Sequence, residues 1–138
     1  MFNDKLVIKS VILAFLAYLL ITAIASAVAI QFWLPEGADM AQAQRLASQD
    51  MSLTALTLAI GASACVLTGM LVTYMTKSQG LRNALALAML ITLYGLLSVF
   101  THLEQPLIVH FAKLALPTLA VITGAYWVIH STQAKLAG

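Results

Sequence analysis

The sequence predicts an all-α integral membrane protein, an up-down bundle of four transmembrane helices. Three observations support this prediction. The chain is 62% hydrophobic and 9% charged, whereas a soluble domain carries about 25% charged residues. Its apolar residues form four tracts, at 10–34, 51–76, 83–101 and 106–130, and each is close to the ~20 residues that a spanning helix needs. The cationic residues between the tracts gather on one side, as the positive-inside rule requires.

The composition also limits the domains and partners that we expect. In 138 residues, four spans leave room for short turns and one longer loop, so we expect a single transmembrane domain over 1–138. The cationic residues flank the helix ends and form no basic stripe, which argues against a nucleic-acid partner. Cys65 is the single cysteine, and this excludes an intrachain disulfide or a thiolate metal cage. We expect neither a metal nor a cofactor.

The first tract begins after Lys5 and Lys9. Ala27-Val28-Ala29 has the form of a signal-peptidase site, but the apolar run is longer than the ~7–15 residues of a signal-peptide core. We therefore expect an uncleaved anchor helix.

The segment 35–50 is longer and polar. Its apolar residues fall near helical spacing, which predicts a short amphipathic helix on the outer surface. An N-terminal extension of the second span and a solvated loop are the alternatives. Asp50 directly precedes the second tract and is placed to cap that helix.

The second tract carries Gly61, Cys65 and Gly69 at four-residue spacing. Small residues at this spacing allow close approach between helix backbones, so we expect the stripe to pack inside the bundle, with a dimer seam as the alternative. The tetrapeptide at 66–69, Val-Leu-Thr-Gly, is echoed at 121–124 by Val-Ile-Thr-Gly. Parallel repeats of this kind occur in some carriers, but four positions are weak evidence of duplication, and we interpret the match as coincidence.

One short turn joins the second tract to the third, and another joins the third to the fourth. We predict that Gly80 ends the second helix in the left-handed conformation and that Pro106 occupies the first position of the fourth helix. The turns at 77–80 and 102–105 are short enough to make the helices that they connect antiparallel neighbours.

The cationic residues predict the orientation. Five lie on the side of the two termini and one on the opposite side; they are Lys5, Lys9, Lys77, Arg82 and Lys135 against Arg45. We therefore expect both termini in the cytoplasm and place the chain in a bacterial inner membrane.

The candidate site lies in the fourth tract. His110, Lys113 and Pro117 follow one another at one-turn spacing on one helix face, and Glu104 lies near the same outer end. Pro117 has no N–H, so the carbonyl of Lys113 loses its usual partner and a kink is favoured. Ionisable residues inside a membrane are costly and are functional candidates.

Lys113 also has simpler interpretations. It lies about 10 Å below the outer boundary at 1.5 Å per residue, and helical side chains lean toward the helix N-terminus. We therefore favour snorkelling to the outer surface, with Glu104 or Asp50 as an ion-pair partner. A ligand or ion site and a contact to a partner subunit are the alternatives.

No catalytic motif is present in the sequence, so we expect a non-enzymatic protein. The leading hypothesis is an accessory subunit that contacts the lipid bilayer and a membrane protein partner or a second copy of itself. The alternative is a small carrier or binder of an anionic or lipid-like molecule, with its polar site at the outer end of the fourth helix.

Overall fold

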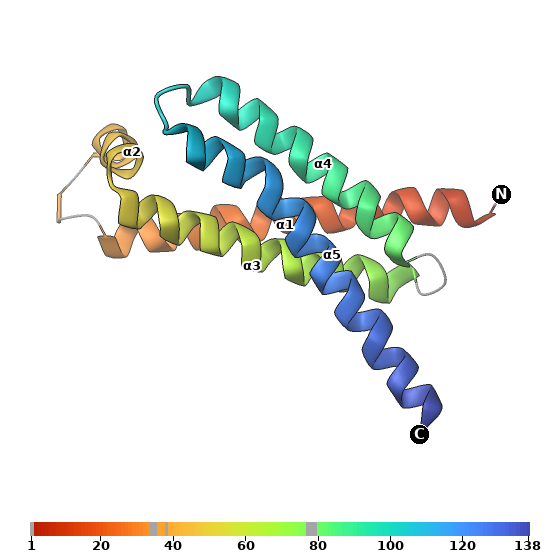
Figure 1. Cartoon of the computed structure of the whole chain (residues 1–138). Helices are drawn as coiled ribbons and strands as arrows, with labels where there is room; N and C mark the ends of the chain where they lie inside the picture. Colours follow the sequence, from red (N-terminus) through yellow and green to blue (C-terminus); the bar gives the residue numbers. More distant parts are fainter. Residues whose placement is uncertain (1, 34–35, 38, 77–79) are drawn as a thin grey trace.

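The computed structural model describes residues 2–33, 36–37, 39–76 and 80–138. These residues form five α-helices, and they contain no strand (Figure 1). Four helices are long and apolar enough to cross a membrane, which confirms that part of the predicted fold class. The helices are α1 (Phe2–Trp33), α2 (Met40–Gln49), α3 (Met51–Thr76), α4 (Gly80–Thr101) and α5 (Leu107–Ala137).

Three of the long helices extend beyond their predicted tracts. α1 begins at Phe2 rather than near residue 10, α4 begins at Gly80 rather than at 83, and α5 continues to Ala137 rather than to about 130. Hydropathy detects the apolar part of a helix, whereas the backbone hydrogen bonds continue through the polar residues at its ends. Leu34, the last residue of the first predicted tract, lies outside the described residues.

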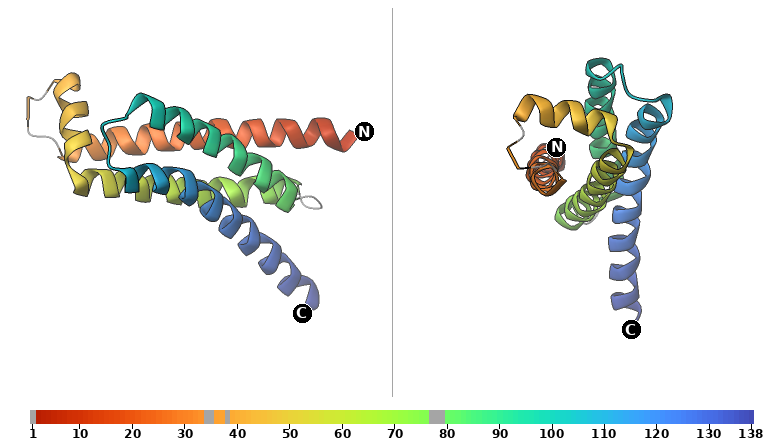
Figure 2. Two further views of the ribbon diagram at one scale, coloured as in Figure 1. Left: turned by 45° about the horizontal axis from the view of Figure 1, so that its top comes forward. Right: turned by 90° about the vertical axis from the view of Figure 1, so that its left-hand side faces the viewer.

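A short helix forms in the first loop, as predicted. α2 is separate from α3 and lies crosswise to the long helices (Figure 2), so the alternatives of a continuous extension and a solvated loop are wrong. The break falls at Asp50, whose backbone N–H still donates to Leu46 O at 3.0 Å.

Asp50 joins the end of α1 to the start of α3. Its Oδ1 accepts the backbone N–H of Ser52 at 2.9 Å, which confirms the predicted helix cap. Its Oδ2 accepts the indole N–H of Trp33, the last residue of α1, at 2.8 Å. The hydrogen bond from Trp33 and, to a smaller extent, that from Ser52 hold the pKa of Asp50 below its usual value. One carboxylate therefore caps α3 and fixes both ends of the first loop.

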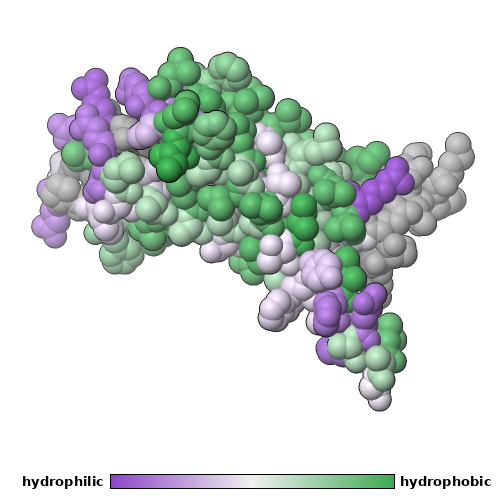
Figure 3. Space-filling view, viewed as in Figure 1, coloured by the Kyte–Doolittle hydropathy of each residue, from purple (hydrophilic) through white to green (hydrophobic). Residues whose placement is uncertain are grey.

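The long helices run alternately between two ends of the molecule. The start of α1, the start of α4 and the end of α5 lie toward one end, here called the terminal end, and α2 and the α4–α5 turn lie toward the other, here called the α2 end (Figure 1). Polar residues gather over α2 and over the last turns of α5, with an apolar surface between them (Figure 3). This is the distribution that a bilayer requires of a protein crossing it.

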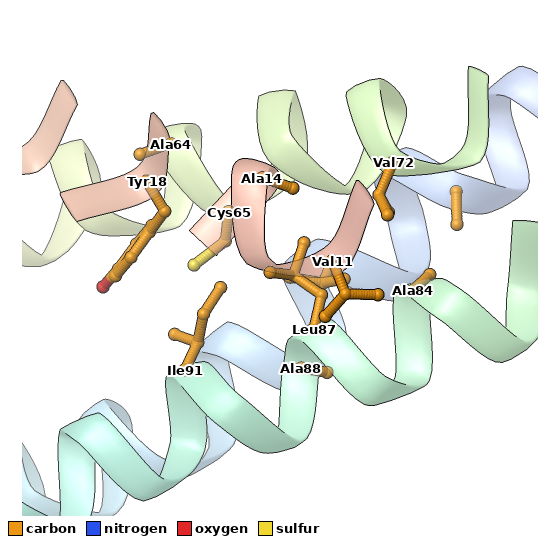
Figure 4. Close-up of a cluster of buried hydrophobic side chains, with 12 residues drawn as sticks. Val11, Ala14, Tyr18, Ala64, Cys65, Val72, Ala84, Leu87, Ala88 and Ile91 are labelled. Atoms are coloured by element: carbon orange, nitrogen blue, oxygen red, sulfur yellow. The ribbon is translucent and has the colours of Figure 1, made fainter. Parts of the chain in front are cut away.

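Alanine and cysteine make up half of the packed core. Its buried members come from all four long helices, and several of them point toward one another in Figure 4. Within lipid, helices associate through close van der Waals contact rather than through a hydrophobic force, which favours small side chains at the interface. The core consists of Val11, Ala14, Tyr18, Ala64, Cys65, Val72, Ala84, Leu87, Ala88, Ile91, Val121 and Ala125.

The closest approach joins α3 to α5 through the repeated tetrapeptides. A Cβ added to Gly69 would collide with the backbone carbonyl of Val121, and a Cβ added to Gly124 would collide with that of Val66. Each glycine therefore lies against the first residue of the other tetrapeptide, and the contact is reciprocal. This packing gives a physical reason for glycine at the fourth position of both segments.

The predictions for Gly80 and Pro106 are wrong, although both residues lie at the start of a helix. Gly37, not Gly80, is the glycine with positive φ among the described residues. Gly80 is instead the first residue of α4, where a Cβ would lie 2.5 Å from Thr73 Cγ2, so it serves the close approach of α4 to α3. Pro106 is the N-cap residue of α5 rather than its first helical residue; its carbonyl accepts from the N–H of Val109 at 3.0 Å.

Because the folded-state pKa of Asp50 is lowered, its stabilising effect is present above the unfolded pKa of about 4 and is lost as pH falls through the folded value. We expect Asp50→Ala to lower the melting temperature at neutral pH and to remove this part of the acid sensitivity. Thermal unfolding in mild detergent from neutral pH to about pH 3 measures both effects. Glu36→Ala is the control, since it removes an exposed carboxylate from the same loop. Equal melting curves for the two variants would contradict the role of Asp50.

Candidate functional site

A cavity of about 320 Å³ lies between the four long helices, in the half of the bundle nearer the α2 end. The volume is at the lower limit of the range for small-molecule sites. Every long helix supplies part of its wall. The lining residues are Tyr18, Leu19, Thr22, Ala23 and Ser26 of α1; Thr57, Leu58, Gly61, Ala62 and Cys65 of α3; Ile91, Tyr94, Gly95 and Ser98 of α4; and Ala112, Lys113, Leu116 and Pro117 of α5.

The cavity lies where α4 leaves α3. The two helices are close at the terminal end, where Gly80 approaches Thr73, and they separate toward the α2 end in every view (Figures 1 and 2). At Gly61, α3 faces the open space between the helices, because a Cβ added there would meet no atom within 4 Å. Gly69, eight residues further along α3 toward the terminal end, is in tight contact. The stripe of Gly61, Cys65 and Gly69 therefore passes from an open wall into packed helices.

α4 stays close to α5 beside the cavity. A Cβ added to Gly95 would lie 3.0 Å from the backbone oxygen of Lys113. This is the carbonyl that Pro117, having no N–H, leaves without its intrahelical donor. One turn away, the hydroxyls of Thr92 and Thr118 form a hydrogen bond of 3.2 Å between the two helices. α5 is a continuous helix through Pro117, and its axis changes direction near the middle (Figure 2).

Lys113 is half-buried and lines the cavity. Its ammonium donates to Gln105 Oε1 at 2.5 Å, which lies in the α4–α5 turn, and to Ser98 Oγ of α4 at 3.4 Å. The side chain thus reaches toward the α2 end, the direction that snorkelling predicts. Its partners differ from the expected carboxylates: the bonds go to neutral groups, and among the described residues no ion pair joins Lys113 to Glu104 or Asp50.

Two threonine hydroxyl groups in the cavity wall are bonded to their own helices. Thr22 donates to Tyr18 O at 2.8 Å, and Thr57 donates to Thr54 O at 2.9 Å. Such bonds satisfy a hydroxyl hydrogen in an apolar environment, while the oxygen lone pairs stay available. Of the described lining residues, Lys113 is the one that carries a full charge at neutral pH. The cavity wall therefore consists of apolar side chains and neutral polar groups, with one cationic group.

The four predicted site residues do not form one cluster. Lys113 and Pro117 line the cavity, but His110 does not, and its Nδ1 is a buried atom without a hydrogen-bond partner in the described part of the chain. Glu104 is exposed in the α4–α5 turn. Gly61 and Cys65, which the sequence assigns to helix packing, also line the cavity.

Several site residues were not identified from the sequence. Gln105 and Ser98 hold the ammonium, and Tyr18 and Tyr94 line the wall. Ser98 lies fifteen residues before Lys113, and their contact depends on the register of two antiparallel helices. A polar residue near the end of an apolar tract is a weak signal, since serine and glutamine are also common at helix ends and in turns.

A comparison of the chain with protein-family models, with curated proteins and with solved structures gives no match. The site is therefore interpreted from its own geometry.

The single cysteine offers a direct test of the cavity. We expect a small neutral thiol reagent, such as methyl methanethiolsulfonate, to modify Cys65 slowly but measurably in the folded protein, because Cys65 lines the cavity although it is 1% exposed. Gly61→Leu should slow the reaction several-fold by filling the space one turn away. Gly61→Ala is the matched control and should react nearly as fast as the parent chain. Mass spectrometry of the intact protein measures the rate, and equal rates in the leucine and alanine variants would count against an open cavity.

Proposed function

We propose that this chain is a non-enzymatic membrane protein that binds, and in transport would carry, an amphipathic anion in the cavity between its four long helices. The observation that supports the proposal is the position of Lys113. Its charge is half-buried in the wall of an apolar cavity, and its partners among the described residues are the neutral groups of Gln105 and Ser98.

Removing an ammonium from water costs free energy, and neutral hydrogen-bond acceptors recover part of that cost. An anion recovers more, because it adds the attraction between opposite charges, which is stronger in a low-dielectric environment than in water. An ammonium has three N–H donors, and two are used by Gln105 and Ser98. The third is available for a ligand headgroup.

The proposed orientation places the α2 end outside the cytoplasm. The exposed residues Lys9, Arg82 and Lys135 lie at the terminal end, and cationic residues near helix ends are retained in the cytoplasm. Both termini would then be cytoplasmic, in a bacterial inner membrane, and the cavity would lie in the outer half of the bilayer.

The sequence alone favours an accessory subunit over a binder, and the cavity reverses this order. An accessory subunit requires no internal space, whereas a binder does, and the helices leave that space around the one intramembrane lysine. We therefore place the binder first and keep the accessory subunit as the outcome to be distinguished by experiment.

Purified protein should bind decanoate more tightly than decanol, its uncharged analogue. Lys113→Met should reduce the affinity for decanoate at least about tenfold, since a hydrogen bond to a charged group contributes ~1.5–3 kcal/mol, and should leave decanol binding unchanged. Lys135→Met removes an exposed cationic residue from the last turn of α5 and is the control. Ligand-induced thermal stabilisation in detergent measures each affinity.

Loss of decanoate binding in both lysine variants would refute the assignment to Lys113. If decanoate does not bind the parent chain, and a single membrane protein co-purifies with it in constant ratio, the accessory hypothesis replaces the binder.

A further inference from the structure

The cavity has a closed floor opposite Lys113. Tyr18, Cys65 and Ile91 line the cavity and belong to the packed core, and they are 9%, 1% and 1% exposed. Figure 4 shows Cys65 of α3 and Ile91 of α4 pointing toward one another, with Tyr18 of α1 beside them. Beyond them toward the terminal end, the core continues with the fully buried Leu87 and Val72. A ligand that enters from the α2 end therefore stops at these residues.

The depth of the cavity follows from the helices that line it. On α1 the lining extends from Tyr18 to Ser26, and on α3 from Thr57 to Cys65. At 1.5 Å of rise per residue, each of these segments is about 12 Å long. An extended chain of C–C bonds, each ~1.5 Å long and inclined to the chain axis, spans that depth with about ten carbons.

The width admits one chain. The volume of about 320 Å³ over a depth of about 12 Å gives a mean cross-section of about 27 Å². Carbon chains in van der Waals contact lie ~4 Å apart and need about 16 Å² each, so one chain fits this mean cross-section and two side by side exceed it.

The cationic group of the wall lies at one end of the cavity, with several hydroxyl groups around it. Ser26, Thr57, Ser98 and Lys113 all lie in the part of the wall nearer the α2 end. Leu19 and Ile91 line the deeper part, where Tyr18 and Cys65 also contribute a hydroxyl and a thiol. The arrangement matches an amphiphile whose headgroup lies at the mouth and whose tail lies toward the floor.

Building on the proposed function, we propose that the ligand is a single-chain anionic amphiphile of about ten carbons, with a carboxylate or phosphate headgroup at Lys113 and its chain end at the floor formed by Tyr18, Cys65 and Ile91. Ile91 then determines the chain length that binds best. Two-chain phospholipids are disfavoured, because a second chain exceeds the mean cross-section of the cavity.

The test is a series of saturated fatty carboxylates from about 6 to about 16 carbons, with each affinity referred to the free ligand concentration after its partition into detergent has been measured. Affinity should rise roughly fourfold per methylene, the value for burial of a CH₂ group, and should stop rising near ten carbons. Alkyl phosphates of the same lengths report the headgroup preference, and a diacyl phosphatidate should bind at least about tenfold more weakly than decanoate.

Ile91→Ala should move the best chain length upward, because it lowers the floor. Leu87→Ala is the matched control: Leu87 is an equally buried aliphatic residue one turn away on α4, and it does not line the cavity. It should leave the best chain length unchanged. If Ile91→Ala does not fold, Ile91→Val makes a smaller change of the same sign.

Two results would overturn the inference while leaving the proposed function intact. One is Lys113-dependent binding whose affinity keeps rising beyond about twelve carbons in the parent chain. The other is the same best chain length in the parent chain and in the folded Ile91 variant. Failure of the proposed function is different, because no chain length would then depend on Lys113.

Discussion

The reciprocal contact between α3 and α5 is the constraint on which the rest of the structure depends. Gly69 lies against the backbone of Val121, and Gly124 lies against that of Val66, so each helix presents a glycine to the backbone of the other. In a bilayer, where lipid is as apolar as leucine, close van der Waals contact of this kind replaces the hydrophobic force as the cause of helix association. The contact fixes where α3 and α5 cross, and the other two long helices pack around that crossing.

The cavity follows from how α4 is held. Near the terminal end, Gly80 brings α4 close to α3; further along, Gly95 and the Thr92–Thr118 hydrogen bond keep α4 beside α5. Because α5 crosses α3 rather than running along it, α4 leaves α3 as it follows α5. The space that opens is bounded below by the core and lined on one side by Lys113. The proposed binding site is therefore a consequence of the close contacts between the helices that surround it.

The sequence predicted the four long helices, the short helix in the first loop and the cap at Asp50, because hydropathy, spacing and capping are local properties. It also singled out Lys113 and Pro117. It did not predict the cavity or the partners of Lys113, since these depend on which helices meet and at what angle. The small-residue stripe illustrates the limit: Gly61 and Gly69 have the same spacing signal, yet one lines a cavity and the other contacts a backbone.

The most direct test of this account compares three glycine-to-alanine substitutions. We expect Gly69→Ala and Gly124→Ala each to lower the free energy of unfolding by ~1–3 kcal/mol, the cost of overpacking. Gly61→Ala should be neutral or stabilising by up to ~1 kcal/mol, since it gains helix propensity without meeting a neighbour. Reversible unfolding in mixed detergent measures all three. Equal effects at the three positions, or the largest loss at Gly61, would contradict the account.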